Sequence, residues 1–66
     1  MNLNQREMRT ELRRQVDEAG GVMAWSRAKG LSHAPVSWAL SGSRPVTESV
    51  ANAAGFLVET TYKKVS

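Results

Sequence analysis

The chain has 66 residues, a net charge of +3 and a pI near 10. A chain of this length forms one small domain, and the absence of cysteine excludes disulfides and thiolate metal sites. One histidine, His33, cannot form a histidine metal site, and no nucleophile, phosphate-loop or paired-carboxylate motif is present, so we expect no enzyme activity, metal, cofactor or small-molecule substrate.

No apolar run approaches the ~20 residues that cross a bilayer, and the N-terminus lacks the apolar stretch of a signal peptide. These absences predict a cytoplasmic protein without a membrane partner. A core this small is only marginally stable, which favours self-association in a chain that has no disulfide.

The first predicted element is a helix over residues 4–19. Asn4 can cap it, and Glu7 stands three residues later, where its side chain completes a capping box. Gly20 favours a helix end because glycine adopts the left-handed conformation without strain. Apolar residues recur every three or four positions and predict one buried stripe, which consists of Met8, Leu12, Val16 and Ala19.

The same helix carries arginines at positions 6, 9, 13 and 14. Arg13 and Asp17 have the i, i+4 spacing of a surface ion pair. We interpret the four arginines as a solvated helix face rather than as a second binding strip.

Two short helices follow, separated by a turn. The first is predicted over Val22–Lys29 and is closed by Gly30. The second is predicted over His33–Ser41, with Ser32 able to cap its start and Gly42 ending it.

The remaining residues predict one more helix and a strand. Thr47 can cap a fourth helix that ends at Gly55. Residues 57–65 are rich in alternating β-branched and aromatic side chains, which predict a strand. A lone strand leaves backbone groups unpaired, so we expect it to pair with a short partner segment or with its own copy in a homodimer. The expected fold is mainly α: a small four-helix domain over residues 1–66 with a C-terminal β-strand.

Charge is distributed unevenly along the chain. Residues 19–47 contain no acidic side chain, whereas Arg27, Lys29, His33 and Arg44 all lie in this segment. An uninterrupted basic segment suits an anionic partner, and nucleic acid is the first candidate at this pI.

The helix expected over residues 33–41 has two different sides. Successive residues rotate by 100°, which places Val36, Ala39 and Leu40 together on the aliphatic side. The opposite side is small and uncharged apart from one tryptophan. Its residues are Ala34, Ser37, Trp38 and Ser41. Small side chains allow a helix to enter the ~12 Å wide major groove of DNA, and no carboxylate is present to repel phosphate.

Residues 22–42 have the pattern of a helix-turn-helix, in which a glycine-containing turn joins two short helices. Together with the flanking positions, residues 25–44 resemble the helix-turn-helix of the lambda-repressor-like and Cro-like transcriptional regulators of bacteriophages. The resemblance consists of a small residue in the first helix, the turn residues, a β-branched anchor followed by serine, and a glycine followed by a basic residue. The matching residues are Ser26, Gly30, Leu31, Ser32, Val36, Ser37, Gly42 and Arg44.

The resemblance implies a set of DNA contacts. The residues that would face base edges are His33, Ala34, Ser37, Trp38 and Ser41, and those that would meet phosphate are Ser43 and Arg44. The family often has glutamine or asparagine early in this helix, where this chain has His33 and Ala34. His33 would contact a guanine acceptor, and Ala34 would contact a thymine methyl group. The backbone amides at Gly21 and Val22 would contact a further phosphate at the start of the preceding helix.

The function implied is that of a sequence-specific, double-stranded DNA-binding transcriptional regulator. It would be a phage or prophage repressor or Cro-type protein that acts by occupying its operator in a bacterial cytoplasm. A homodimer would read two half-sites of inverted symmetry. The alternative is a protein-interaction module, such as an antitoxin or antirepressor with the same scaffold, because the aromatic Trp38 can also anchor a protein interface.

Overall fold

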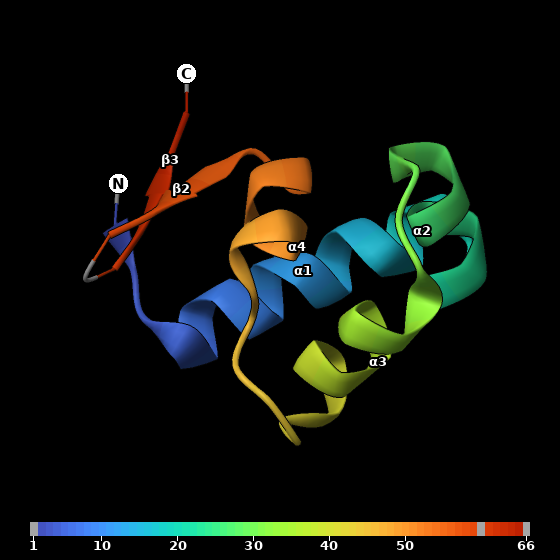
Figure 1. Ribbon diagram of the computed structural model, residues 1–66, viewed down its shortest axis with the longest axis horizontal. Helices are drawn as coiled ribbons and strands as arrows, with labels where there is room; N and C mark the ends of the chain where they lie inside the picture. The colour runs from blue at the N-terminus through green and yellow to red at the C-terminus, as the bar shows by residue number, and fades with distance from the viewer. Residues whose placement is uncertain (1, 60, 66) are drawn as a thin grey trace.

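The computed structural model describes residues 2–59 and 61–65, and it is mainly helical, with four helices and a three-stranded antiparallel sheet (Figure 1). The helices are α1 (Gln5–Ala19), α2 (Val22–Lys29), α3 (His33–Ser41) and α4 (Glu48–Ala53). The strands are β1 (Asn2–Leu3), β2 (Phe56–Val58) and β3 (Tyr62–Lys64). None of the helices in the described part of the chain has the length and apolar character that a bilayer crossing requires.

Helix α1 begins and ends where its local signals predict. The Glu7 amide donates to Asn4 Oδ1 at 2.9 Å, and the Asn4 amide donates to Glu7 Oε1 at 3.0 Å, so both halves of the capping box form. Gly20 ends the helix in the left-handed region, with φ of 99°. The prediction that Ala19 belongs to the buried stripe is wrong. Ala19 is exposed because it lines an open hollow between α1 and α2.

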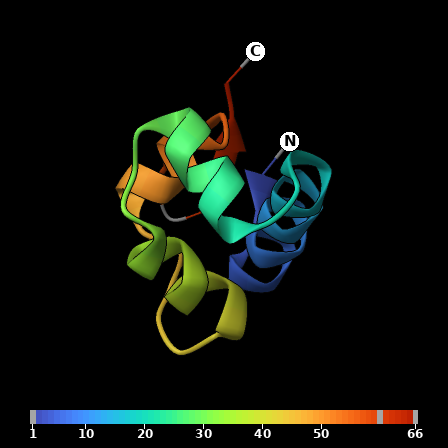
Figure 2. The same ribbon diagram turned by 90° about the vertical axis from the view of Figure 1, so that its right-hand side faces the viewer.

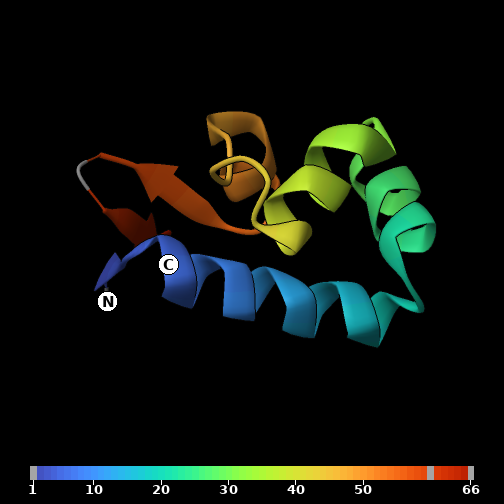
Figure 3. The same cartoon turned by 90° about the horizontal axis from the view of Figure 1, so that it is seen from below.

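The core lies between α1 and the other elements. Figure 3 shows α1 running along one side of the molecule, with α2, α3, α4 and the sheet on the other. In Figure 2, α1 lies on the right, and α3 and α4 lie on the left. The α1 stripe supplies Met8, Leu12 and Val16 to this core. The other elements and the loop after α3 supply Trp25, Val36, Ala39, Leu40, Val46, Val50, Ala51, Phe56 and Tyr62.

The prediction of a single strand over residues 57–65 is wrong, because this stretch folds back on itself. The amide of Glu59 donates to the carbonyl of Thr61 at 2.9 Å, and β2 and β3 form an antiparallel hairpin. Strand β1 pairs with the other side of β3, which gives the order β1-β3-β2. β1 and β2 together pair the backbone groups of β3 on both sides, and the hairpin buries Phe56 and Tyr62 in the core. Thr60, part of the expected alternation, lies outside the described residues.

A polar link joins the start of α1, the loop after α3 and β3. The Tyr62 hydroxyl donates to the Val46 carbonyl at 2.7 Å and accepts from Gln5 Nε2. The Val46 amide donates in turn to Gln5 Oε1 at 3.1 Å. Burial raises the pKa of Tyr62, so the hydroxyl stays a neutral donor over the whole ordinary pH range.

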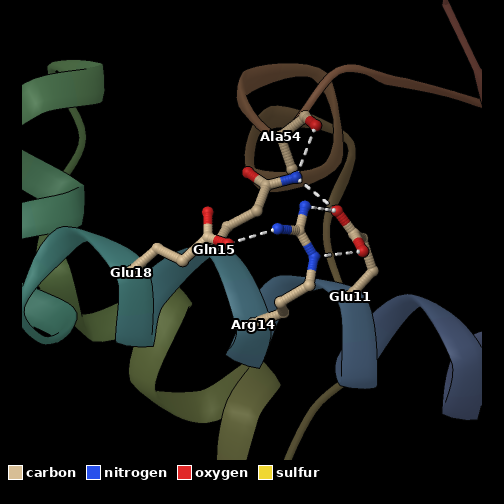
Figure 4. A network of polar contacts seen from close by, with 5 residues as sticks. All are labelled: Glu11, Arg14, Gln15, Glu18 and Ala54. Carbon is tan, nitrogen blue, oxygen red and sulfur yellow. Dashed lines mark hydrogen bonds and ion pairs between the residues drawn. The ribbon is translucent and has the colours of Figure 1, made fainter.

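A second polar network holds α1 to α4 (Figure 4). Arg14 donates to Glu11 at 2.6 Å and to Glu18 at 2.7 Å. Gln15 Nε2 donates to Glu11 Oε2 at 2.9 Å and to the carbonyl of Ala54 at 3.0 Å. The hydrogen bond from Arg14 is the largest of the effects that lower the pKa of Glu11 from 4.5 to about 2.

We expect Tyr62→Phe to lower the free energy of unfolding by about 1–3 kcal/mol, because the buried Val46 carbonyl then loses its donor. Urea unfolding followed by far-ultraviolet circular dichroism measures the change. Lys63→Gln, on the exposed side of the same strand, is the matched control and should remain within about 0.5 kcal/mol of the wild type. Equal stability of Tyr62→Phe and the wild type would contradict the link.

We expect Glu11→Gln to reduce the loss of stability in acid. The Glu11 carboxylate has a lower pKa in the folded chain than in the unfolded chain, so its contribution is complete above pH 4.5 and is lost as the pH falls to about 2. A glutamine cannot titrate, so the variant's unfolding free energy should fall less steeply across this window. Urea unfolding at several pH values measures the two slopes, with Glu59→Gln as the exposed control. Identical slopes for Glu11→Gln and the wild type would refute the assignment.

Candidate nucleic-acid interface

Helix α3 exposes the side that its sequence predicts. Val36 and Ala39 are 0% exposed and Leu40 is 8% exposed, which confirms that the aliphatic side is buried. Figure 2 places α3 at the lower edge of the molecule. On its outer side Ser37 is exposed, and Trp38 retains 41% of its surface. This outward side is therefore open to a partner.

Most of the residues predicted to contact DNA lie on this open surface. The exposed ones are His33, Ser37, Trp38, Ser41, Ser43 and Arg44. Ala34 differs, because it is half-buried and offers only part of its methyl group to a partner. The structure thus brings the predicted residues together along α3 and the loop that follows it.

The start of α3 lacks the side-chain cap that Ser32 was expected to provide. Ser32 occupies the capping position with extended backbone, but its hydroxyl makes no capping hydrogen bond. Pro35 stands at the third helical position, where a backbone N–H would normally donate to the hydroxyl oxygen of the cap, and proline has no N–H. The amides of His33 and Ala34 are therefore left without a side-chain cap at the positive end of the helix.

We define the α3 corner as Trp38, Ser41, Ser43 and Arg44, which form one connected cluster. The Trp38 carbonyl accepts from the amide of Arg44 at 3.4 Å and from the hydroxyl of Ser41 at 3.1 Å. The hydroxyls of Ser41 and Ser43 lie 2.8 Å apart in a hydrogen bond. The Arg44 guanidinium stands over the indole ring of Trp38, 4.3 Å from its centroid. A cation and an aromatic surface are thus presented together where α3 ends.

Two of the four α1 arginines contact α3, although Arg13 itself stays exposed, as the interpretation of a solvated face expects. Arg9 Nε donates to the carbonyl of Ala39 at 2.9 Å, and Arg13 Nη2 donates to the carbonyl of Leu40 at 3.4 Å. The ion pair expected between Arg13 and Asp17 is not among the ion pairs of the described residues. Only one feature of the sequence indicates these contacts between α1 and α3. The last turn of α3 has no basic residue of its own that could pair with its carbonyls.

A hollow of about 250 Å³ lies between α2 and the start of α3. Its lining includes Met23, Ser26, Arg27 and His33. The Ser26 hydroxyl is buried and has no hydrogen-bond partner within the described part of the chain. Gly21, at the start of α2, likewise provides no side-chain cap, so the first amides of α2 also remain open.

The chemistry of this surface is that of hydrogen-bond donors and cations. Across residues 2–59 and 61–65, no group of three histidine, cysteine, aspartate or glutamate side chains could hold a metal ion. The surface instead offers open helix amides, hydroxyls, one indole and guanidinium groups. Comparisons of the chain with protein-family models, with curated proteins and with solved structures find no significant match.

Proposed function

We propose that this chain is a sequence-specific, double-stranded DNA-binding transcriptional regulator in which α2, the turn and α3 act as a helix-turn-helix. The observation that carries the proposal is the exposed side of α3, which has small uncharged side chains and one tryptophan and ends in a cationic corner. In this proposal α3 enters the major groove, and bound protein blocks or redirects polymerase by occupying the operator, as a phage repressor or Cro-type protein does.

Phosphate contacts would come from both sides of α3. The α3 corner supplies the Arg44 guanidinium and the Ser43 hydroxyl, both exposed. At the other end, Arg27 beside the α2–α3 hollow and the open amides at the start of α2 supply further donors. Residues 19–47 contain no carboxylate that would oppose these contacts. The proposed bound strand therefore meets donors near both ends of α3.

A second copy would pair at the β2 edge of the sheet. Strand β3 has partners on both sides, so it has no free edge, whereas β2 is an outer strand. Leu57 on β2 is 50% exposed, which leaves apolar surface on this outer strand. A two-fold axis there would give the dimer that reads two half-sites about one helical turn apart.

The decisive experiment is the selection of binding sites from random duplexes by the purified protein, followed by affinity measurements at several salt concentrations. We expect enrichment of an inverted repeat and an affinity that falls with salt at a slope of about −0.9 per neutralised phosphate. No enrichment, together with a flat salt response, would refute DNA binding. The same exposed Trp38 would then have to serve a protein partner, as an antitoxin or antirepressor would use it.

We expect a variant of the α3 corner to change the overall affinity for DNA, and a variant of the outer side of α3 to change the preference among bases. Arg44→Ala should weaken binding to every sequence alike and reduce the salt slope by about 0.9. Ser37→Ala should change the preference among bases, by about 1–3 kcal/mol at the affected position. Lys63→Ala, on the sheet, is the control and should change neither quantity. The reverse pattern would show that α3 is not the helix that reads bases.

We expect Leu57→Lys to convert a dimer into a monomer, because a charge at the β2 edge opposes pairing between copies. Light scattering after size-exclusion chromatography measures the mass. Because Leu57 is exposed, the variant should keep the wild-type circular dichroism spectrum. A deletion of residues 57–66 is not a suitable test of the dimer, because the deletion would also remove Tyr62 from the core. A wild-type monomer, or a dimeric variant, would exclude pairing at this edge.

A further inference from the structure

We infer that Arg9 and Arg13 of α1 are positioning residues for α3, which set the selectivity of DNA binding without contacting DNA. This inference rests on the proposed function, because selectivity has meaning only if α3 reads DNA. Both arginines lie on α1, whereas the side chains expected to contact DNA lie on α3 and in the loop after it.

The geometry places both guanidinium groups at the C-terminal end of α3. Arg9 Nε meets the Ala39 carbonyl at 2.9 Å, and Arg13 Nη2 meets the Leu40 carbonyl at 3.4 Å. The donors stand four residues apart on α1 and so lie on one face, while their acceptors are consecutive residues of α3. The Arg9 Cζ also lies 3.6 Å from the point that a Cβ of Gly42 would occupy. Arg9 therefore packs against the first residue after α3.

These contacts supply what α3 lacks on its own. The last carbonyls of a helix have no partner within it and carry the negative end of its dipole. α3 has nine residues and no basic side chain in its last turn, so cations from α1 take that place. Two donors on successive carbonyls fix the position of α3 along its axis, which the aliphatic contacts of Val36, Ala39 and Leu40 constrain less sharply because they are not directional.

Axial position affects the two kinds of DNA contact differently. Short side chains such as Ser37 and Ala34 meet base edges only if the α3 backbone is correctly placed. The long side chain of Arg44 reaches a phosphate from a range of backbone positions. Loss of the Arg9 contact should therefore reduce discrimination between sequences and leave binding to arbitrary duplex DNA largely unchanged.

Arg9→Lys tests this inference while conserving charge. The lysine side chain places a methylene group where Nε of arginine donates its hydrogen bond, so the variant loses the directed contact. Arg6→Lys on the same helix is the matched control, because Arg6 lines the hollow beside the sheet instead. Affinities for the selected duplex and for a scrambled duplex are measured at several salt concentrations, and circular dichroism verifies the fold. Arg13→Lys provides the same test if Arg9→Lys does not fold.

For Arg9→Lys we expect the ratio of selected to scrambled affinity to fall about tenfold, the effect of one mismatched base pair. The salt slope should be that of the wild type, and Arg6→Lys should match the wild type in both measurements. An unchanged ratio in a folded variant would overturn the inference. Equal weakening on both duplexes would also overturn it, since Arg9 would then be a phosphate contact.

The free protein offers a separate check on the contact itself. The Nε–H of Arg9 should exchange with solvent more slowly than that of Arg6 in nuclear magnetic resonance spectra, because it is hydrogen-bonded to Ala39. Equal exchange rates would overturn the geometry without reference to DNA. A wild-type chain that selects no duplex would instead refute the proposed function, and the role in selectivity with it, even where exchange at Arg9 is slow.

Discussion

The burial of one side of α3 against the rest of the core determines which surface this small protein presents. Burying a valine or leucine side chain contributes about 1.5–3 kcal/mol, and a hydrogen bond from a charged group such as the Arg9 guanidinium contributes a similar amount, about 1.5–3 kcal/mol. The rotation of α3 is set by Val36, Ala39 and Leu40, because turning the helix about its axis would expose these buried side chains to water. With the rotation set, directed contacts from α1 limit movement of α3 along its axis, and most of the outer side stays exposed, with Arg44 over the ring of Trp38.

Much of this architecture could be predicted from the sequence because its signals are local. The capping box of Asn4 and Glu7 and the left-handed glycines at positions 20, 30 and 42 lie within a few residues of the helix ends that they determine. The buried side of α3 followed from helical periodicity alone. Both kinds of signal depend on neighbours along the chain, so no knowledge of distant contacts was needed to read them.

The features that sequence reasoning missed depend on partners far along the chain. β1 has two residues, too few to show an alternating pattern, and its partner β3 lies at the other end of the chain. The contacts of Arg9 and Arg13 join residues 30 and 27 positions apart, and exposed arginines on a helix look the same with or without them. The missing cap at Ser32 is different, because the sequence already shows a proline three positions later, where one of the two amides that can donate to a capping hydroxyl is absent.

The pairing of β1 with β3 has a consequence for the order of folding. Leu3 and Tyr62 face each other across these strands, so their meeting closes a loop of nearly the whole chain. The entropy lost in closing a loop grows with its length, whereas the helices need only neighbours. The pairing of β1 with β3 should therefore form after the helices have drawn the two ends together, whereas the β2–β3 hairpin is local. Fraying would begin at the same place, and it would release β1 while β3 stays paired with β2.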